Sequence, residues 1–290
     1  LYENAERNTR LRKKTIPAAT LFASFMEERK STGRIYLQNV DNANDHGSFL
    51  PEVAPIRQSN LCAEINLPTK PLNDLNDPEG EISLCTLSAI NWGNVRTPED
   101  FEKACTLAVR GLDALLSYQN YPILAAQLST EKRRTLGVGI INFAYWIAKH
   151  DLTYQDIDAD GLNLIDEYAE AWSYYLIKAS ADLAAEQGAI FFENIVNENT
   201  TSTRQLIIHE VMGRNCGYLT AQTALEYNNR VKNKVFFPEL LIDDKRWGID
   251  AIYIPEIDFD FQVEAERLKK VMDKKDCVNI FLSEGAGLEA

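Results

Sequence analysis

From residue 206 onward, apolar runs alternate with helix-like segments, and this alternation limits the fold more than any other feature of the chain. The runs at 206–211, 251–254 and 278–282 are nearly continuously apolar, as strands buried on both faces are. The segment 262–274 carries its apolar residues at helical spacing. Strands that alternate with helices predict a parallel α/β sheet. We therefore expect a parallel sheet in the C-terminal part of the chain.

Three earlier segments have helical patterns. Apolar residues recur three and four positions apart in 100–117 and in roughly 162–187, where Gly188 is expected to end the helix as a C-terminal cap. Residues 10–30 carry one apolar stripe and are also expected to be helical. The stretch 35–39 predicts a strand.

Polar and apolar residues alternate in 59–65. Successive side chains of an extended strand point to opposite faces, so Asn60, Cys62 and Glu64 are expected to share one face. A thiol between an amide and a carboxylate is unusual on an otherwise apolar segment, which favours a functional role. A free cysteine that packs as a small apolar residue on a half-exposed strand accounts for the same pattern. The alternation alone leaves both interpretations open.

The composition is that of a folded protein, since 45% of the 290 residues are apolar and 10% are aromatic. The net charge of −13 argues against nucleic-acid binding through a basic surface. It leaves a phosphate-bearing substrate open, because one local arginine can bind a phosphate. The apolar runs stop well short of the roughly 20 residues that a membrane span needs. We therefore expect neither nucleic acid nor a membrane as a partner.

The cysteines are scattered, without a C-x-x-C pair or a histidine at ligand spacing. They are Cys62, Cys85, Cys105, Cys216 and Cys277. The three histidines are far apart in sequence, so no metal site is predicted. An odd number of cysteines without a secretion signal fits a reducing compartment, and the cytoplasm is the expected location. Residues 1–4 show neither a starting Met nor a signal pattern, and we expect them to lie inside a longer sequence.

Five sequence motifs in the first part of the chain point to one enzyme family. They are STGRIY at 31–36, RQSNLCAEI at 57–65, LPTKPL at 67–72, SLCTLSAIN at 83–91 and RTLGVGIINFAY at 134–145. Together they resemble the large catalytic subunit of class I ribonucleotide reductase. The resemblance implies that residues 1–187 are a fragment of the α/β barrel of that subunit.

The resemblance also implies roles for four residues. Cys62 corresponds to the cysteine that becomes a thiyl radical and abstracts the 3′ hydrogen of a ribonucleotide. Glu64 would accept the 3′-hydroxyl proton, and Asn60 would hydrogen-bond to the sugar and orient it. Cys85 corresponds to one of the two cysteines that reduce the 2′ position and end as a disulfide.

Partners follow from the same resemblance. In this family a metal-containing small subunit supplies the radical, a dithiol protein supplies the reducing equivalents, and a nucleoside diphosphate is the substrate. No cofactor is expected to bind this chain directly. The second reducing cysteine and the phosphate-binding loop of the family match nothing in this sequence. We therefore expect the chain to require the remaining large-subunit segments for activity.

A second set of sequence motifs lies beyond residue 187. They are EVMGR at 210–214, CG at 216–217, PE at 255–256 and SEG at 283–285. In order and spacing they resemble phosphofructokinases, most nearly the pyrophosphate-dependent group. The resemblance implies that residues 188–290 are part of a parallel-sheet, phosphofructokinase-like α/β segment.

This second resemblance places Met212, Gly213 and Arg214 at a sugar-phosphate substrate and Glu256 at the sugar hydroxyls. Arginine suits a phosphate because its planar guanidinium donates two hydrogen bonds to the phosphate oxygens. For Arg214 alone, a surface charge at the start of a helix is the alternative. The resemblance leaves room for Mg²⁺, although the phosphoryl-donor loop and the catalytic aspartate of the family match nothing in the sequence.

These observations leave three hypotheses. The chain is the central catalytic segment of a ribonucleoside-diphosphate reductase, or a phosphofructokinase fragment that transfers a phosphoryl group to fructose 6-phosphate, or an artificial fusion without activity. Residues 184–189 fit either family, so we place the boundary between the two parts there. We expect reductase chemistry as the main inherited function and no activity from the isolated chain.

Overall fold

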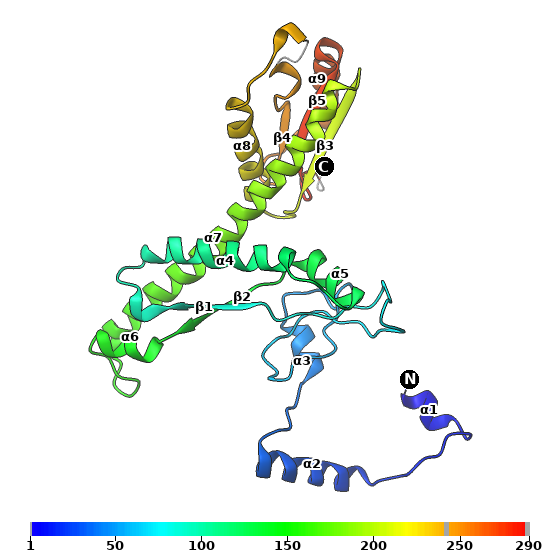
Figure 1. Cartoon of the computed structure of the whole chain (residues 1–290), viewed down its shortest axis with the longest axis vertical. Helices are drawn as coiled ribbons and strands as arrows, with labels where there is room; N and C mark the ends of the chain where they lie inside the picture. Colours follow the sequence, from blue (N-terminus) through cyan, green and yellow to red (C-terminus); the bar gives the residue numbers. More distant parts are fainter. Residues whose placement is uncertain (1, 241–243, 288–290) are drawn as a thin grey trace. The chain divides into compact units, whose positions relative to one another are not determined.

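The computed structural model describes residues 2–240 and 244–287 (Figure 1). The chain divides into two compact units. The first comprises Leu1–Thr86 with Leu115–Gly137, and the second comprises Leu87–Ala114 with Val138–Ala290.

In its described residues the first unit is mostly loop, with four whole helices and the end of α4 (Asp100–Tyr118). The whole helices are α1 (Tyr2–Arg7), α2 (Ala18–Thr32), α3 (Val40–Asp45) and α5 (Leu124–Arg133). The helix predicted over 10–30 begins only at Ala18, after Pro17, and it ends at Gly33 with a left-handed φ of 65°. Proline disfavours a helical conformation of the residue before it, which explains the late start. The strand predicted at 35–39 is wrong, since this stretch pairs with no other strand.

The strand predicted at 59–65 is also wrong. Residues 61–63 form a turn in which the Ala63 N–H donates to the Asn60 carbonyl at 3.0 Å. Ala63 adopts a φ of 62°, which no strand residue has. Side chains that hydrogen-bond to nearby backbone groups compete with strand pairing, and Asn60 makes such a bond to the Ile65 N–H.

The second unit begins with a two-stranded sheet of β1 (Leu87–Asn91) and β2 (Gly137–Ile141). Around it lie the short helix η1 (Trp92–Asn94), α4 (Asp100–Tyr118), α6 (Phe143–Lys149) and the first half of α7 (Ala159–Val196). Trp92, Phe101, Trp146 and Tyr168 form the buried aromatic core of this part. Within the described residues these two strands do not close into a barrel.

Helix α7 passes through Gly188 without a break, so the C-terminal cap predicted there is wrong. A side chain at Gly188 would place its Cβ 3.0 Å from Cγ2 of Thr223 on α8 (Tyr218–Lys232). The glycine therefore permits a close approach of two helices. Because α7 is also continuous across 184–189, it gives no local break there, and the boundary between the two parts stays a prediction.

The parallel sheet predicted for the C-terminal part is confirmed. Its strands are β3 (Gln205–Val211), β4 (Ala251–Tyr253) and β5 (Cys277–Ser283), in the order β3-β5-β4, and both pairs are parallel. Phe281 of β5 packs with Phe192 and Tyr227 in one buried cluster. On the other face, Val278 and Ile280 contact apolar residues of α9 (Phe261–Lys275). The short helices η2 (Asn197–Thr200), η3 (Pro238–Leu240) and η4 (Asp244–Arg246) complete this region.

No helix in the described part of the chain is both long and apolar enough to cross a membrane.

Candidate functional site

The turn at 59–65 is held by its own side chains. The Asn60 carboxamide donates to Glu64 Oε1 at 2.6 Å, and Asn60 Oδ1 accepts from the Ile65 N–H at 3.1 Å. The Ser59 hydroxyl donates to the Ile65 carbonyl at 2.8 Å. These bonds bring Asn60 and Glu64 together at the base of the turn, and the exposed Cys62 lies between them in the sequence. The three predicted residues thus gather through a loop and not through one face of a strand.

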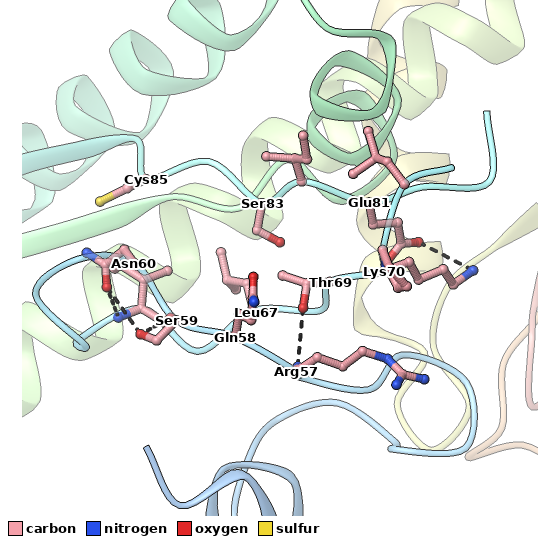
Figure 2. A pocket seen from close by; sticks show the side chains of 14 residues that line it. Arg57, Gln58, Ser59, Asn60, Leu67, Thr69, Lys70, Glu81, Ser83 and Cys85 are labelled. Carbon is pink, nitrogen blue, oxygen red and sulfur yellow. Dashed lines mark hydrogen bonds and ion pairs between the residues drawn. The ribbon is translucent and has the colours of Figure 1, made fainter. Parts of the chain in front are cut away.

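A cavity of about 410 Å³ lies beside this turn, within the first unit. It is lined from three stretches, within 57–60, 65–72 and 81–85. Figure 2 shows Asn60 and Cys85 toward one end of the cavity and Lys70 with Glu81 toward the other. Of the four residues predicted for the reductase-like site, Asn60 and Cys85 line the cavity, whereas Cys62 and Glu64 do not.

The other end of the cavity holds a charge cluster that sequence reasoning missed. Arg133 Nη2 lies 3.1 Å from both carboxylate oxygens of the buried Glu81. Lys132 and Lys70 approach Glu81 Oε1 at 3.7 and 3.9 Å. Arg133 also lies over the Phe49 ring, 5.7 Å from its centroid. The run of basic residues at 132–134 in a strongly acidic chain was the available signal.

A second group of predicted site residues lies at one edge of the parallel sheet. Met212, Gly213 and Arg214 follow β3, Glu256 follows β4, and Glu284 follows β5. Because the three strands are parallel, their carboxyl ends meet at the same edge, which is where open α/β sheets bind ligands.

Hydrogen bonds connect the loops at this edge. Arg214 Nη2 lies 3.0 Å from Glu284 Oε1, and the Gly213 carbonyl accepts from the Ser283 hydroxyl. The Gly217 N–H, just before α8, donates to the Glu256 carboxylate at 2.8 and 3.0 Å. Met212 is 79% exposed. The structure therefore brings Arg214 beside the loop after β5, but it engages both Arg214 and Glu256 with protein groups.

Two of the remaining cysteines are structural. Cys105 and Cys277 are fully buried, and burial raises the pKa of the Cys105 thiol to about 11. A thiol with so high a pKa is a poor nucleophile at neutral pH. All five cysteines are free. In the described ranges, no group of three or more His, Cys, Asp or Glu side chains is placed to hold a metal ion.

The described residues thus form a mixed α/β fold with a cysteine-bearing turn beside a cavity that Cys85 lines. The chain belongs to the ribonucleotide reductase barrel-domain family, whose model, described as "Ribonucleotide reductase, barrel domain", matches residues 1–237. The resemblance to the large reductase subunit is thus confirmed.

Two relatives illustrate the match. The ribonucleoside-diphosphate reductase subunit alpha of Buchnera aphidicola subsp. Acyrthosiphon pisum is 54% identical over 197 residues, which are 68% of this chain and 26% of the relative. Ribonucleoside-diphosphate reductase 1 subunit alpha of Escherichia coli is 56% identical over 189 residues, 65% of this chain and 25% of the relative. The chain therefore spans about a quarter of the length of the reductase subunits that it matches.

The second resemblance is also confirmed. The pyrophosphate–fructose 6-phosphate 1-phosphotransferase of Methylomonas methanica is 54% identical over 107 residues, which are 37% of this chain and 26% of the relative. One chain thus has strong similarity to two enzymes of different chemistry.

Proposed function

We propose that this chain supplies the radical-bearing turn and one reducing thiol of a ribonucleoside-diphosphate reductase α subunit. The observation that carries the proposal is that Asn60, which anchors the turn around Cys62, and Cys85 line the same cavity. A ribose beside Asn60 would then lie in the same cavity as the Cys85 thiol.

Each residue has a distinct role in this proposal. The Cys62 thiyl radical takes a hydrogen atom from C3′ of the substrate, which leaves a carbon radical on the sugar and a thiol on Cys62. Glu64 accepts the 3′-hydroxyl proton as a general base. Asn60 positions the sugar by hydrogen bonding, and its bond to Glu64 fixes the orientation of that carboxylate. Cys85 and a second thiol each give up one proton and one electron during reduction at the 2′ position, so that the 2′-hydroxyl leaves as water, a hydrogen takes its place and the two sulfurs form a disulfide.

The proposal includes partners. A radical-generating small subunit, a dithiol reductant and a nucleoside diphosphate are the expected partners, in a reducing cytoplasm. The remaining large-subunit segments would supply the second reducing cysteine. This chain itself provides the turn and the cavity.

A transplanted segment tests the proposal. The part of this chain that aligns with a full-length reductase α subunit replaces the corresponding part of that subunit, and ribonucleoside-diphosphate reduction is measured with small subunit and dithiol. We expect turnover that Cys62→Ser abolishes and that Cys85→Ser limits to at most a single incomplete turnover. Cys105→Ser is the matched control. Cys105 lies in the apolar core, so its substitution is expected to leave the chemistry unchanged. Normal multiple turnover by the Cys62→Ser or Cys85→Ser variant would refute the assigned roles.

A second function is favoured by the loops at the carboxyl edge of the parallel sheet. We propose that Met212, Gly213, Arg214 and Glu256 contact a sugar phosphate such as fructose 6-phosphate. A bound phosphate would have to displace Glu284 from Arg214, because the two are paired at 3.0 Å. Binding of fructose 6-phosphate to the chain, measured by calorimetry, should weaken in Arg214→Gln and strengthen in Glu284→Gln. Equal affinity in both variants would exclude this contact.

A further inference from the structure

Two cationic side chains of the cavity in the first unit have unused hydrogen-bonding capacity. Arg57 lines the cavity, is exposed, and makes no ion pair or side-chain hydrogen bond within the described ranges. Lys70 lines the same cavity and lies 3.9 Å from Glu81 Oε1, which is beyond hydrogen-bond distance. Figure 2 shows the Arg57 and Lys70 side chains away from the end of the cavity where Cys85 lies. Arg57 and Lys70 thus make this side of the cavity locally positive, although the whole chain has a net charge of −13.

The single negative charge of the Glu81 carboxylate does not neutralise the charges of both Lys70 and Lys132. Arg133 contacts both of its oxygens at 3.1 Å and is itself largely buried, with its side chain 15% exposed. Lys70 and Lys132 are left at longer distances from the same carboxylate. Three cations therefore surround one carboxylate, and the Lys70 ammonium is free to donate hydrogen bonds to a further anion.

The backbone around both residues is fixed. The Lys70 N–H donates to the Glu81 carbonyl at 3.1 Å, and the Glu81 N–H donates to the Lys70 carbonyl at 3.2 Å, which forms an antiparallel bridge. The Arg57 N–H donates to Thr69 Oγ1 at 3.2 Å, and the Thr69 N–H donates to the Pro55 carbonyl at 3.2 Å. Three chain segments are thus joined side by side. Backbone hydrogen bonds therefore fix the positions from which the Arg57 and Lys70 side chains extend.

We propose that the Arg57 and Lys70 side of this cavity is an anion-binding subsite that accepts a phosphate group. The planar guanidinium of Arg57 can donate two parallel hydrogen bonds to phosphate oxygens, and the Lys70 ammonium adds a compact positive charge. The phosphate group belongs either to a free phosphate or pyrophosphate ion or to a phosphorylated small molecule that extends along the cavity. The subsite goes beyond the proposed reductase role, since it requires no chemistry at Cys62 or Cys85.

Calorimetric titration of the purified 290-residue chain with pyrophosphate tests the subsite. At low salt, Arg57→Gln and Lys70→Gln are each expected to weaken binding by about tenfold or more, which corresponds to ~1.4 kcal/mol. Lys70→Arg should retain binding, because it keeps the charge. Arg34→Gln is the matched control, since Arg34 is exposed and lies outside the cavity. Thermal unfolding of each variant checks that the fold is intact.

One further ligand, a nucleoside diphosphate, distinguishes the two sources of the phosphate. A nucleoside diphosphate that competes with pyrophosphate and binds more tightly indicates a phosphorylated molecule along the cavity, whereas equal affinities indicate the ion alone; both results support the subsite. The titration measures binding and needs no reductase turnover, so a failure of the reductase role does not affect this test. The subsite is refuted if the chain does not bind pyrophosphate at low salt, or if Arg57→Gln and Lys70→Gln bind as tightly as Arg34→Gln.

Discussion

The Asn60 carboxamide and the Glu64 carboxylate are joined by a hydrogen bond of 2.6 Å, four residues apart, across the turn that carries Cys62. The same amide accepts from the Ile65 N–H through its oxygen. One side chain therefore closes the turn and holds the proposed general base. Local order of the turn should depend on Asn60 more than on any core residue.

Asn60→Ala tests this dependence. The substitution removes the hydrogen bonds of the amide with Glu64, with the Ile65 N–H and with the Ser59 hydroxyl, each with a net contribution of about 1 kcal/mol, and the turn should open more often. Hydrogen exchange at the Ile65 amide is the direct measurement, and we expect clearly faster exchange in the variant. Asn76→Ala is the control, because the Asn76 side chain is exposed and makes no hydrogen bond among the described residues. Unchanged exchange at Ile65 would show that the turn is held by other contacts.

The turn also shows where sequence reasoning failed. The alternation in 59–65 is a valid strand signal, but the decisive features are the hydrogen bond that Asn60 Oδ1 accepts from the Ile65 N–H and the positive φ of Ala63. A side-chain bond to the local backbone leaves no periodic pattern, and alanine carries no preference for a left-handed conformation. The resemblance supplied the expected site residues, and only the structure revealed the turn that holds Asn60 and Glu64 together.

The C-terminal sheet was predictable for the opposite reason. Its central strand, β5, is buried along nearly its whole length, so an apolar run identifies it directly. The Glu81 cluster could not be predicted, because Arg133 lies 52 residues away in the sequence and meets Glu81 only after folding. The contact of Gly188 with Thr223 is likewise invisible in the sequence, where a glycine at the end of a helical pattern predicts a cap.

Glu81→Gln should destabilise the first unit. Glu81 is 7% exposed, and its loss leaves the largely buried Arg133 without its carboxylate partner. Removal of one partner from a buried pair costs about 3–5 kcal/mol. Chemical denaturation should show a lower transition midpoint. Glu79→Gln, at an exposed position nearby, is expected to stay within about 0.5 kcal/mol of the wild type. Equal stability of the two variants would mean that the cluster contributes no net stabilisation.

His209 should make stability depend on pH. Its ring packs against Phe192 and Phe281, with centroid distances of 5.4 Å to each, and burial lowers the pKa of the imidazole below its usual 6.5. The unfolded chain then binds a proton more readily than the folded chain when the pH falls below about 6.5. Stability is therefore lost on acidification through the window between 6.5 and the lowered pKa, by at most about 1.4 kcal/mol per pH unit.

Denaturation at pH 7.5 and pH 5.5 measures this effect. The wild type should lose more stability between the two pH values than His209→Gln, in which no imidazole is buried. His46→Gln serves as the matched control, because His46 is exposed and packs against neither Phe192 nor Phe281. The same loss in His209→Gln as in the wild type would assign the pH dependence to other groups.

Gly285→Ala should disrupt the loops at the carboxyl edge of the parallel sheet. A Cβ at this position would lie 1.6 Å from the Arg214 carbonyl oxygen, so the backbone of one of the two loops must move. This movement would separate Arg214 from Glu284, which are paired at 3.0 Å. Overpacking of this kind costs about 1–3 kcal/mol, and thermal unfolding should reveal a lower midpoint. Gly248→Ala is the matched control, since the nearest atom to its Cβ would be 3.9 Å away. If the two alanine variants unfold at the same temperature, the close contact between the loops after β3 and β5 is not a feature of the folded protein.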